Sequence, residues 1–288
     1  IQLLLPIMAL FLYSTSPMAN AETLTFPCGP NGETYSVLMP RGVLLDGTKC
    51  KGSLTIDERV TVIDNGAFFR NKSITSVVIP TSVTNIGDGG GNGAFQDSGL
   101  ISVNIPNSIT RIESATFYGT LLTSITIPST VKLIGENAFA YAPLTTVDIP
   151  KSVTSIGIGA FSNTRLVSVS IPDSIKTIPY YAFANSKLER VTIPNSVIEI
   201  GDMAFTSNLL TSLTLGTSLS QIGYAAFSGN SKLNVLELPN SLKVIGESAF
   251  NGTDLKVLTI PDSVESIFSR AFYGNIDLTT VSIPDSLK

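Results

Sequence analysis

The sequence predicts an elongated, mainly β solenoid. It would contain about ten repeats of 22–23 residues, with a concave parallel β-sheet on one side and short turns or 3₁₀ segments on the convex side. Phenylalanine recurs at intervals of 27, then six times 22, then 23 and 22, and proline keeps nearly the same period. Apolar and polar residues alternate before each proline. A fixed period of this size is the signature of stacked repeats. The periodic phenylalanines are Phe68, Phe95, Phe117, Phe139, Phe161, Phe183, Phe205, Phe227, Phe250 and Phe272.

The first part of each repeat predicts a short strand. In "LTSITIPSTVKLIGENAF", which spans residues 122–139, apolar Ile125 and Ile127 alternate with polar Ser124 and Thr126. This alternation is typical of a strand with one buried face. Pro128 then ends the ladder, because proline has no backbone N–H to donate.

The second part of the repeat predicts a return across the stack. Val131 and Ile134 are spaced by three residues, and the segment ends at Gly135, where we expect a positive φ. Ala138 and Phe139 then turn inward, in one short helical or 3₁₀ turn. A polar corner of four or five residues leads to the next strand.

Stacking explains why the chain repeats itself. A single unit cannot bury its own apolar side, whereas stacked units form continuous ladders of Leu, Val, Ile and Phe. Burial of one Phe side chain contributes about 1.5–3 kcal/mol, so we expect the ten phenylalanines to supply a large part of the stability of the fold.

Three departures from the repeat are visible. Gly216 takes one proline position, and Asp57 takes that position in an opening half-repeat. The insertion "GDGGGNG", residues 87–93, predicts a flexible loop that bulges from the stack. A phosphate or calcium site there is a weaker hypothesis, because no P-loop lysine follows and Asp88 is the one carboxylate.

The repeat resembles the BspA-like (Treponema pallidum-type) leucine-rich repeat. The shared pattern is I-P-x-S-V-x-x-I-G-x-x-A-F, and it covers roughly residues 53–288. Where that class has Cys or Asn after Phe, this chain mostly has Asn, Ser, Gly or Thr, which we expect to affect only the corner. The resemblance implies a leucine-rich-repeat solenoid of the α/β horseshoe class. It also implies a secreted or cell-surface protein that adheres to proteins, cells or glycans, but it implies no particular ligand.

Composition excludes several function classes. The chain of 288 residues is 43% hydrophobic, contains no His and carries a formal net charge of −4. Without His it cannot form a Ser-His-Asp or Cys-His catalytic site. Its acidic balance argues against nucleic acid as a partner. We therefore predict no enzyme activity, no cofactor, no metal and no membrane insertion of the mature segment.

The sequence before the repeats divides into two segments. Residues 1–21 are an apolar run followed by Ala19-Asn20-Ala21, which predicts a secretory signal peptide that lacks its beginning. Residues 22–52 predict an N-terminal cap closed by a Cys28–Cys50 disulfide. Residues 53–288 are the repeats, and we expect the repeat array to be truncated at its C-terminal end.

The third and fifth positions of each strand are the candidate ligand-binding positions, because they point away from the core. They form a neutral Ser/Thr surface with a few charges and an apolar pair, although Ser and Thr are also ordinary exposed strand residues. The candidates are Ser124, Thr126, Thr146, Asp148, Ser168, Ser170, Arg190, Thr192, Ser212, Thr214, Val235, Glu237 and Val257. Asn71 and Asn251 begin N-glycosylation sequons, and we expect both in exposed corners.

Two functions remain open. The first is a non-enzymatic, adhesin-like binding protein, secreted or at the cell surface, that docks an extracellular protein or glycan on the concave sheet. The second is a rigid spacer that presents a domain beyond the C-terminus. An ice-binding solenoid is a distant alternative, since Ser outnumbers Thr and charges interrupt the array.

Overall fold

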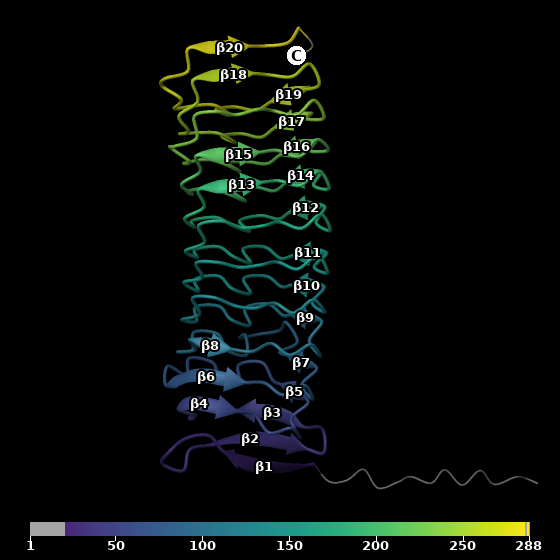
Figure 1. Cartoon of the computed structure of the whole chain (residues 1–288), viewed down its shortest axis with the longest axis vertical. Coiled ribbons are helices and arrows are strands. Elements are labelled where there is room, and N and C mark those ends of the chain that lie inside the picture. Colours follow the sequence, from purple (N-terminus) through teal and green to yellow (C-terminus); the bar gives the residue numbers. More distant parts are fainter. Residues whose placement is uncertain (1–20, 286, 288) are drawn as a thin grey trace, which may run out of the picture.

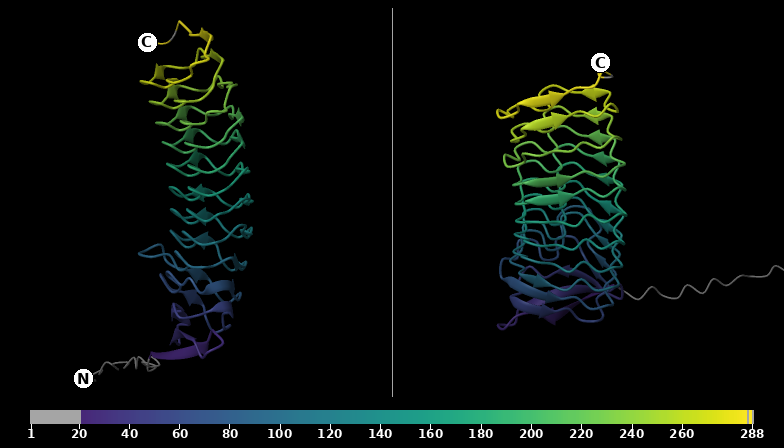
Figure 2. Two further views of the ribbon diagram at one scale, coloured as in Figure 1. Left: turned by 90° about the vertical axis from the view of Figure 1, so that its left-hand side faces the viewer. Right: turned by 45° about the horizontal axis from the view of Figure 1, so that its top comes forward.

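A computed structural model describes residues 21–285 and Leu287 of the chain. The chain forms a parallel β-solenoid of about eleven turns of roughly 22 residues, with no helix among the described residues. The turns stack along one axis from the N-terminal cap to the last repeat (Figure 1). The stack is a shallow arc when it is seen from the side (Figure 2). The predicted solenoid is confirmed.

The first parts of the repeats lie above one another on one side of the stack, at the left in Figure 1, and we call this row of segments the first ladder. Its parallel pairing is divided among three separate sheets. Repeats are numbered from the opening half-repeat that contains Asp57. In repeats four to six, single β-bridges join Thr126, Asp148 and Ser170, and a further bridge joins Ser168 to Arg190 of repeat seven. The predicted sheet is therefore present, but it is broken into ladders and bridges. Its strands are β4 (Gly52–Thr55), β6 (Ile74–Val78), β8 (Ser102–Val103), β13 (Arg190–Thr192), β15 (Ser212–Thr214), β18 (Val257–Thr259) and β20 (Thr280–Ser282).

A second row of parallel strands, at the right in Figure 1, differs from the sequence prediction, which has no strand there. We call it the second ladder, and its pairing is also divided among three sheets. It lies in the returning segment, where Ile134 pairs with both Ile112 and Ile156. All ten of these strands are two residues long, too short to give the period-2 alternation that marks a strand in sequence. They are β5 (Val62–Ile63), β7 (Asn85–Ile86), β9 (Arg111–Ile112), β10 (Leu133–Ile134), β11 (Ser155–Ile156), β12 (Thr177–Ile178), β14 (Glu199–Ile200), β16 (Gln221–Ile222), β17 (Val244–Ile245) and β19 (Ser266–Ile267).

The corner that contains Ala-Phe consists of tight turns rather than a 3₁₀ segment. The amides of Asn137 and Phe139 donate to carbonyls of the next repeat. The amides of Ala138 and Ala140 close turns within their own repeat. Asn137 and Tyr141 are left-handed, with φ of 52° and 61°. A 3₁₀ segment needs consecutive i→i+3 bonds, so the alternation and the left-handed residues prevent one.

The expectation of a positive φ at Gly135 is wrong. The left-handed residue is Asn137, two positions later. Gly135 is required for a different reason. A Cβ atom there would lie 2.6 Å from the Ser114 nitrogen and 2.7 Å from the Glu113 carbonyl carbon. The repeats approach one another so closely at this point that no side chain fits between their backbones.

Gly135→Ala is therefore expected to destabilise the protein by about 1–3 kcal/mol, the usual cost of overpacking. Chemical denaturation followed by circular dichroism measures the change. Gly90→Ala is the control, because Gly90 is exposed and its added Cβ would meet only two side chains, Asp88 at 3.2 Å and Asn65 at 3.9 Å, and no backbone. Equal destabilisation by the two variants would contradict the close-approach explanation.

The ten periodic phenylalanines form one continuous stack. Consecutive ring centroids lie 4.9–5.6 Å apart, and the interplanar angles do not exceed 11°. The first nine rings are fully buried, and Phe272 is partly buried. The predicted spine of phenylalanines thus forms the centre of the core along the whole described stack.

Two sets of side-chain hydrogen bonds join the repeats. In the Pro-x-Ser turn, hydroxyl groups such as Ser174 and Ser196 donate to carbonyls of the preceding repeat, Val153 and Ile175 respectively. Three residues after the phenylalanine, buried side chains satisfy phenylalanine carbonyls. Asn230 Nδ2 donates to both Phe205 and Phe227. The Ser of I-P-x-S-V is therefore part of the stacking mechanism.

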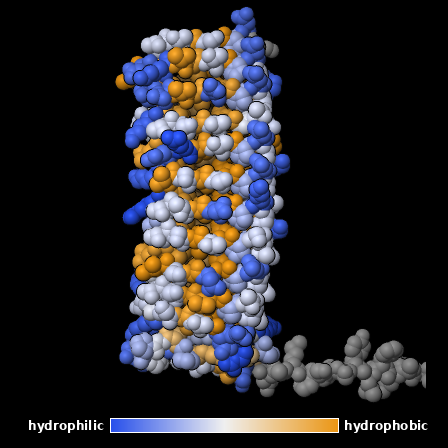
Figure 3. Space-filling view, viewed as in Figure 1, coloured by the Kyte–Doolittle hydropathy of each residue, from blue (hydrophilic) through white to orange (hydrophobic). Residues whose placement is uncertain are grey.

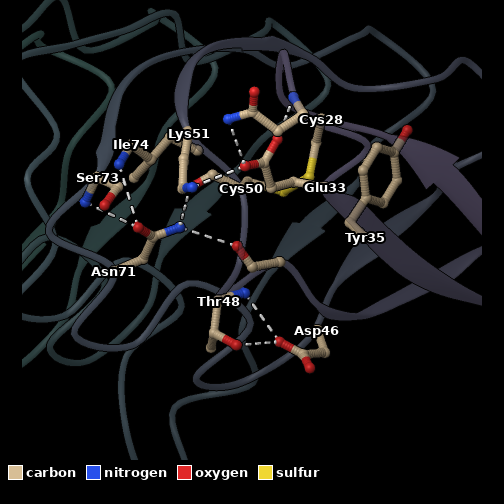
Figure 4. Close-up of a disulfide and its surroundings, with 12 residues drawn as sticks. Cys28, Glu33, Tyr35, Asp46, Thr48, Cys50, Lys51, Asn71, Ser73 and Ile74 are labelled. Carbon is tan, nitrogen blue, oxygen red and sulfur yellow. Dashed lines mark hydrogen bonds and ion pairs between the residues drawn. A yellow bond between two sulfur atoms is a disulfide. The ribbon is translucent and has the colours of Figure 1, made fainter.

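The N-terminal residues close the lower end of the stack. β1 (Glu22–Pro27) and β2 (Thr34–Met39) form an antiparallel hairpin, and β3 (Val43–Asp46) joins that hairpin to the second ladder. The Cys28–Cys50 disulfide is present. It lies beside Glu33 and Lys51 (Figure 4).

Glu33 and Lys51 form an ion pair at the disulfide. Lys51 Nζ lies 2.7 Å from Glu33 Oε1. The hydrogen bond from Lys51, together with the Asn31 amide, lowers the pKa of Glu33 to about 2. Glu33 therefore stays ionised near neutral pH, and the ion pair persists there.

Residues 1–20 of the expected signal peptide lie outside the described residues. Asp88–Asn92 of the insertion are exposed, and the Asp88 carboxylate accepts hydrogen bonds from the Asn65 side chain and the Gly90 amide. In the part of the chain that the structure describes, no helix is long and apolar enough to cross a membrane.

Candidate ligand-binding face

The thirteen candidate residues lie on one side of the first ladder, and all of them are exposed. We call this surface the first-ladder face. It consists of the third and fifth strand positions of successive repeats. Register pairs place Arg190 between Ser168 and Ser212, and Thr192 beside Thr214. The predicted exposure and grouping of these side chains are confirmed. Their role in binding stays a prediction.

The surface of the stack is not uniform. In Figure 3, strongly hydrophilic surface gathers along the right side of the stack and in patches on the left. Apolar and neutral surface runs between them along the length of the molecule. A ligand that follows the long axis would therefore meet a mixed apolar and weakly polar strip.

A broad groove crosses the first-ladder face at repeats five to eight. It has a volume of about 660 Å³. Its polar lining residues are Lys151, Ser168, Ser170, Asp173, Arg190, Thr192, Asn195 and Thr214. Gly216, which replaces the expected proline, is part of its wall. Five of the thirteen predicted residues thus line one groove.

A more apolar groove lies at repeats nine and ten. It has a volume of about 490 Å³ and includes Val235, Glu237 and Val257. Val235 is 65% exposed and Val257 is 55% exposed. A smaller groove of about 310 Å³ lies between the two and includes Ser212, Thr214 and Val235. The predicted valine pair therefore lines a depression in the surface.

The charged residues of the face are too far apart for paired acid–base chemistry. Asp148 belongs to repeat five and Glu237 to repeat nine, which are separated by about 19 Å at the usual strand spacing. Two carboxylates that work together on one bond lie within about 10 Å. Among residues 21–285 and Leu287, no group of three or more His, Cys, Asp or Glu is placed to hold a metal ion.

The expectation that Asn71 lies in an exposed corner is wrong. Its side chain is 4% exposed. Its Nδ2 donates to the carbonyls of Gly47 and Cys50, and its Oδ1 accepts from the amides of Ser73 and Ile74 (Figure 4). A glycan on Nδ2 would remove at least one of these bonds. Asn251 is half-buried, and its use as a glycosylation site stays a prediction.

Sequence reasoning missed the exposed tyrosines on the Ala-Phe corner. Tyr141 is 56% exposed and Tyr180 is 46% exposed. Tyr141 packs against Tyr118, with ring centroids 5.2 Å apart. Tyr141 and Tyr181 are both left-handed, a conformation that bulky residues rarely adopt. The signal in the sequence is the tyrosine immediately before or shortly after the Ala-Phe pair.

Comparison with protein families gives a direct match. A family model described as BspA type leucine rich repeat region matches residues 47–164, 89–211 and 198–288, in six copies. Together these ranges include every repeat of the stack. No curated protein matches the chain.

Solved structures resemble this one over most of its length. The pneumococcal vaccine antigen PcpA is 20% identical, with a TM-score of 0.54 over 92% of this chain and 86% of that protein. The T. pallidum leucine-rich repeat protein TpLRR is 22% identical, with a TM-score of 0.51 over 72% and 90% of the two chains. A leucine-rich repeat protein from Bacteroides ovatus is 24% identical, with a TM-score of 0.46 over 93% and 88%. The first two similarities establish the leucine-rich-repeat fold.

Proposed function

We propose, from the premise that this chain belongs to the BspA-type leucine-rich repeat family, that it is a non-enzymatic binding protein of the secreted or cell-surface class. It holds an extracellular protein or glycan on the first-ladder face. The matched family is defined by a structural repeat and not by a catalytic site. The Cys28–Cys50 disulfide supports an oxidising, extracytoplasmic location.

The observation that carries this proposal is the continuity of the first-ladder face. Its side chains are exposed in register through successive repeats, and grooves of about 490 and 660 Å³ open on it. Extended binding surfaces of this kind are how solenoid proteins usually engage their partners. The stacked core holds the face rigid, so binding orders few additional side chains.

A triple variant tests the location of the face. Ser168→Tyr, Arg190→Glu and Ser212→Tyr change three adjacent exposed residues in register, so the core should remain intact. Purified wild-type chain is presented to immobilised matrix proteins, cell-surface extracts and a glycan array. We expect saturable binding by the wild type and at least tenfold weaker binding by the variant.

A matched control carries equivalent changes on the second ladder. Ser155→Tyr, Lys176→Glu and Gln221→Tyr also alter exposed residues, and their backbones lie on or beside β11, β12 and β16. The control variant should bind as the wild type does. If the first variant still binds, or if the control variant does not, the ligand-binding site lies elsewhere on the molecule.

The continuous phenylalanine stack favours a second candidate function, that of a rigid spacer. About eleven turns at the usual strand spacing give a rod roughly 50 Å long (Figure 2). A spacer would tolerate the triple change and would respond instead to deletion of a whole 22-residue repeat. The two variants therefore separate the two functions.

A further inference from the structure

We propose that the groove at repeats five to eight binds the carboxylate of an acidic sugar, with Arg190 as its principal partner. This inference rests on the proposed function, because it assigns a ligand class to part of the first-ladder face. We call this depression the Arg190 groove. It comprises the lining residues given above, from Lys151 to Gly216.

The charge of the Arg190 groove is opposite to that of the whole chain. The chain carries a net charge of −4, whereas the groove is lined by Lys151 and Arg190 and by one carboxylate, Asp173. Among the described residues neither cation forms an ion pair. The guanidinium of Arg190 is exposed on the face and is available for two parallel bonds to one carboxylate.

The remaining lining suits a polyhydroxylated ligand. Ser168, Ser170, Thr192 and Thr214 present hydroxyl groups that can donate and accept. Asn195 Oδ1 accepts a hydrogen bond from the Thr217 amide. This bond fixes the side-chain amide, and its Nδ2 group points away from Thr217 and can donate to a ligand. The hydroxyls are spread over adjacent repeats, about 4.8 Å apart, and can meet several hydroxyls of one sugar residue.

Apolar surface completes the groove. Pro172 and Pro194 line it, with Ile171, Ile193 and Leu215 at its base. A pyranose ring has an apolar C–H face that packs on such groups while its hydroxyls reach the polar rim. The lining therefore offers charge, hydroxyl and apolar contacts within one depression, a combination typical of ligand sites.

Gly216 keeps one end of the groove open. A Cβ atom at this position would lie 2.4 Å from the Pro194 carbonyl oxygen. The proline found here in other repeats is therefore excluded, and no ring projects from this position. Between Pro80 and Pro284, Gly216 is the one residue that replaces a proline of the series, and it lies in the groove.

An acidic peptide is less well matched to the same groove. The backbone of Arg190–Thr192 is already paired with Ser212–Thr214 of the next repeat. No free strand edge is present there for a peptide to extend the sheet. A peptide would therefore bind through side-chain contacts alone, without backbone hydrogen bonds to the sheet. A sugar has no backbone to pair, so side-chain contacts are sufficient for it.

Calorimetric titration tests the proposal. The probe is a tetrasaccharide of alternating glucuronic acid and N-acetylglucosamine, and its control is the same compound with the carboxylates methyl-esterified. We expect the acid to bind and the ester to bind at least tenfold more weakly. Arg190→Gln should weaken binding of the acid at least tenfold, and raised salt should weaken it as well.

Arg165→Gln is the matched control variant, because Arg165 is exposed but lies outside the groove. It should bind the tetrasaccharide as the wild type does. The proposal is overturned if the wild type does not bind the acid, if the ester binds equally, or if Arg190→Gln has no effect. It is also overturned if a hexaglutamate peptide binds in an Arg190-dependent way while the tetrasaccharide does not bind.

The failure of this inference is distinguishable from failure of the proposed function. If the wild-type chain binds a partner and the triple variant does not, the first-ladder face remains the proposed binding site even if the acidic sugar does not bind. If the triple variant also binds its partner normally, the proposed function fails as well.

Discussion

Phe161→Ala is expected to lower the free energy of unfolding by about 3–5 kcal/mol. Phe161 is fully buried near the middle of the stack, and its ring lies 5.4 Å from Phe139 and 5.5 Å from Phe183. Alanine would leave a cavity and would break both ring contacts. A solenoid repeat touches only its neighbours, so the loss also weakens the coupling between the two halves. Guanidinium denaturation followed by circular dichroism should show a lower midpoint, and two separate transitions if coupling is lost.

Phe268→Ala is the matched control for this prediction. Phe268 is outside the phenylalanine stack and is 56% exposed. Its replacement should cost less than about 1 kcal/mol, as is usual for exposed positions. Similar destabilisation by both variants would show that the stack has no special role in stability.

Asn71→Ala is expected to destabilise the protein by about 3 kcal/mol or more. Its four hydrogen bonds join the loop around the disulfide to the start of β6. Alanine would remove all four bonds. The Gly47 carbonyl would keep its bond from the Cys50 amide and Ser73 is exposed, but the buried Cys50 carbonyl and Ile74 amide would lose their Asn71 partner. Each buried group left unpaired costs about 1–3 kcal/mol. Thermal unfolding with the disulfide intact measures the change.

Asn251→Ala is the natural comparison, because both asparagines begin a sequon. The Asn251 side chain is half-buried and makes none of the bonds that Asn71 makes. The free energy of unfolding of Asn251→Ala should lie within about 0.5 kcal/mol of the wild-type value. A stable Asn71→Ala variant would mean that water or a shifted loop replaces the lost bonds.

Much of the fold was predictable because the same local sequence pattern recurs in every repeat. The spacing of phenylalanine fixes the length of a turn, and the alternation around Ile125 identifies one strand and its exposed positions. The thirteen candidate residues were therefore placed on one face correctly. The second ladder was not predicted, since two-residue strands such as β10 carry no period of their own.

Individual residues were predicted less well than the repeat. Gly135 was assigned a positive φ because glycine commonly has one, but it is glycine because the neighbouring backbone is close. Asn71 and Asn251 have the same local sequon, yet one is buried and the other is not. In both cases the deciding contact comes from a residue about twenty positions away.

The sequence by itself determined the solenoid, its period, the phenylalanine core and the side of the sheet that faces outward. These properties follow from local patterns, because strand alternation and repeat length are set within each unit. Only the tertiary structure decided which outward residues share a groove. Arg190 and Lys151 lie 39 positions apart in the chain, and stacking brings both into one depression beside Gly216. Such a site depends on how adjacent turns register against one another, and no single turn contains that information.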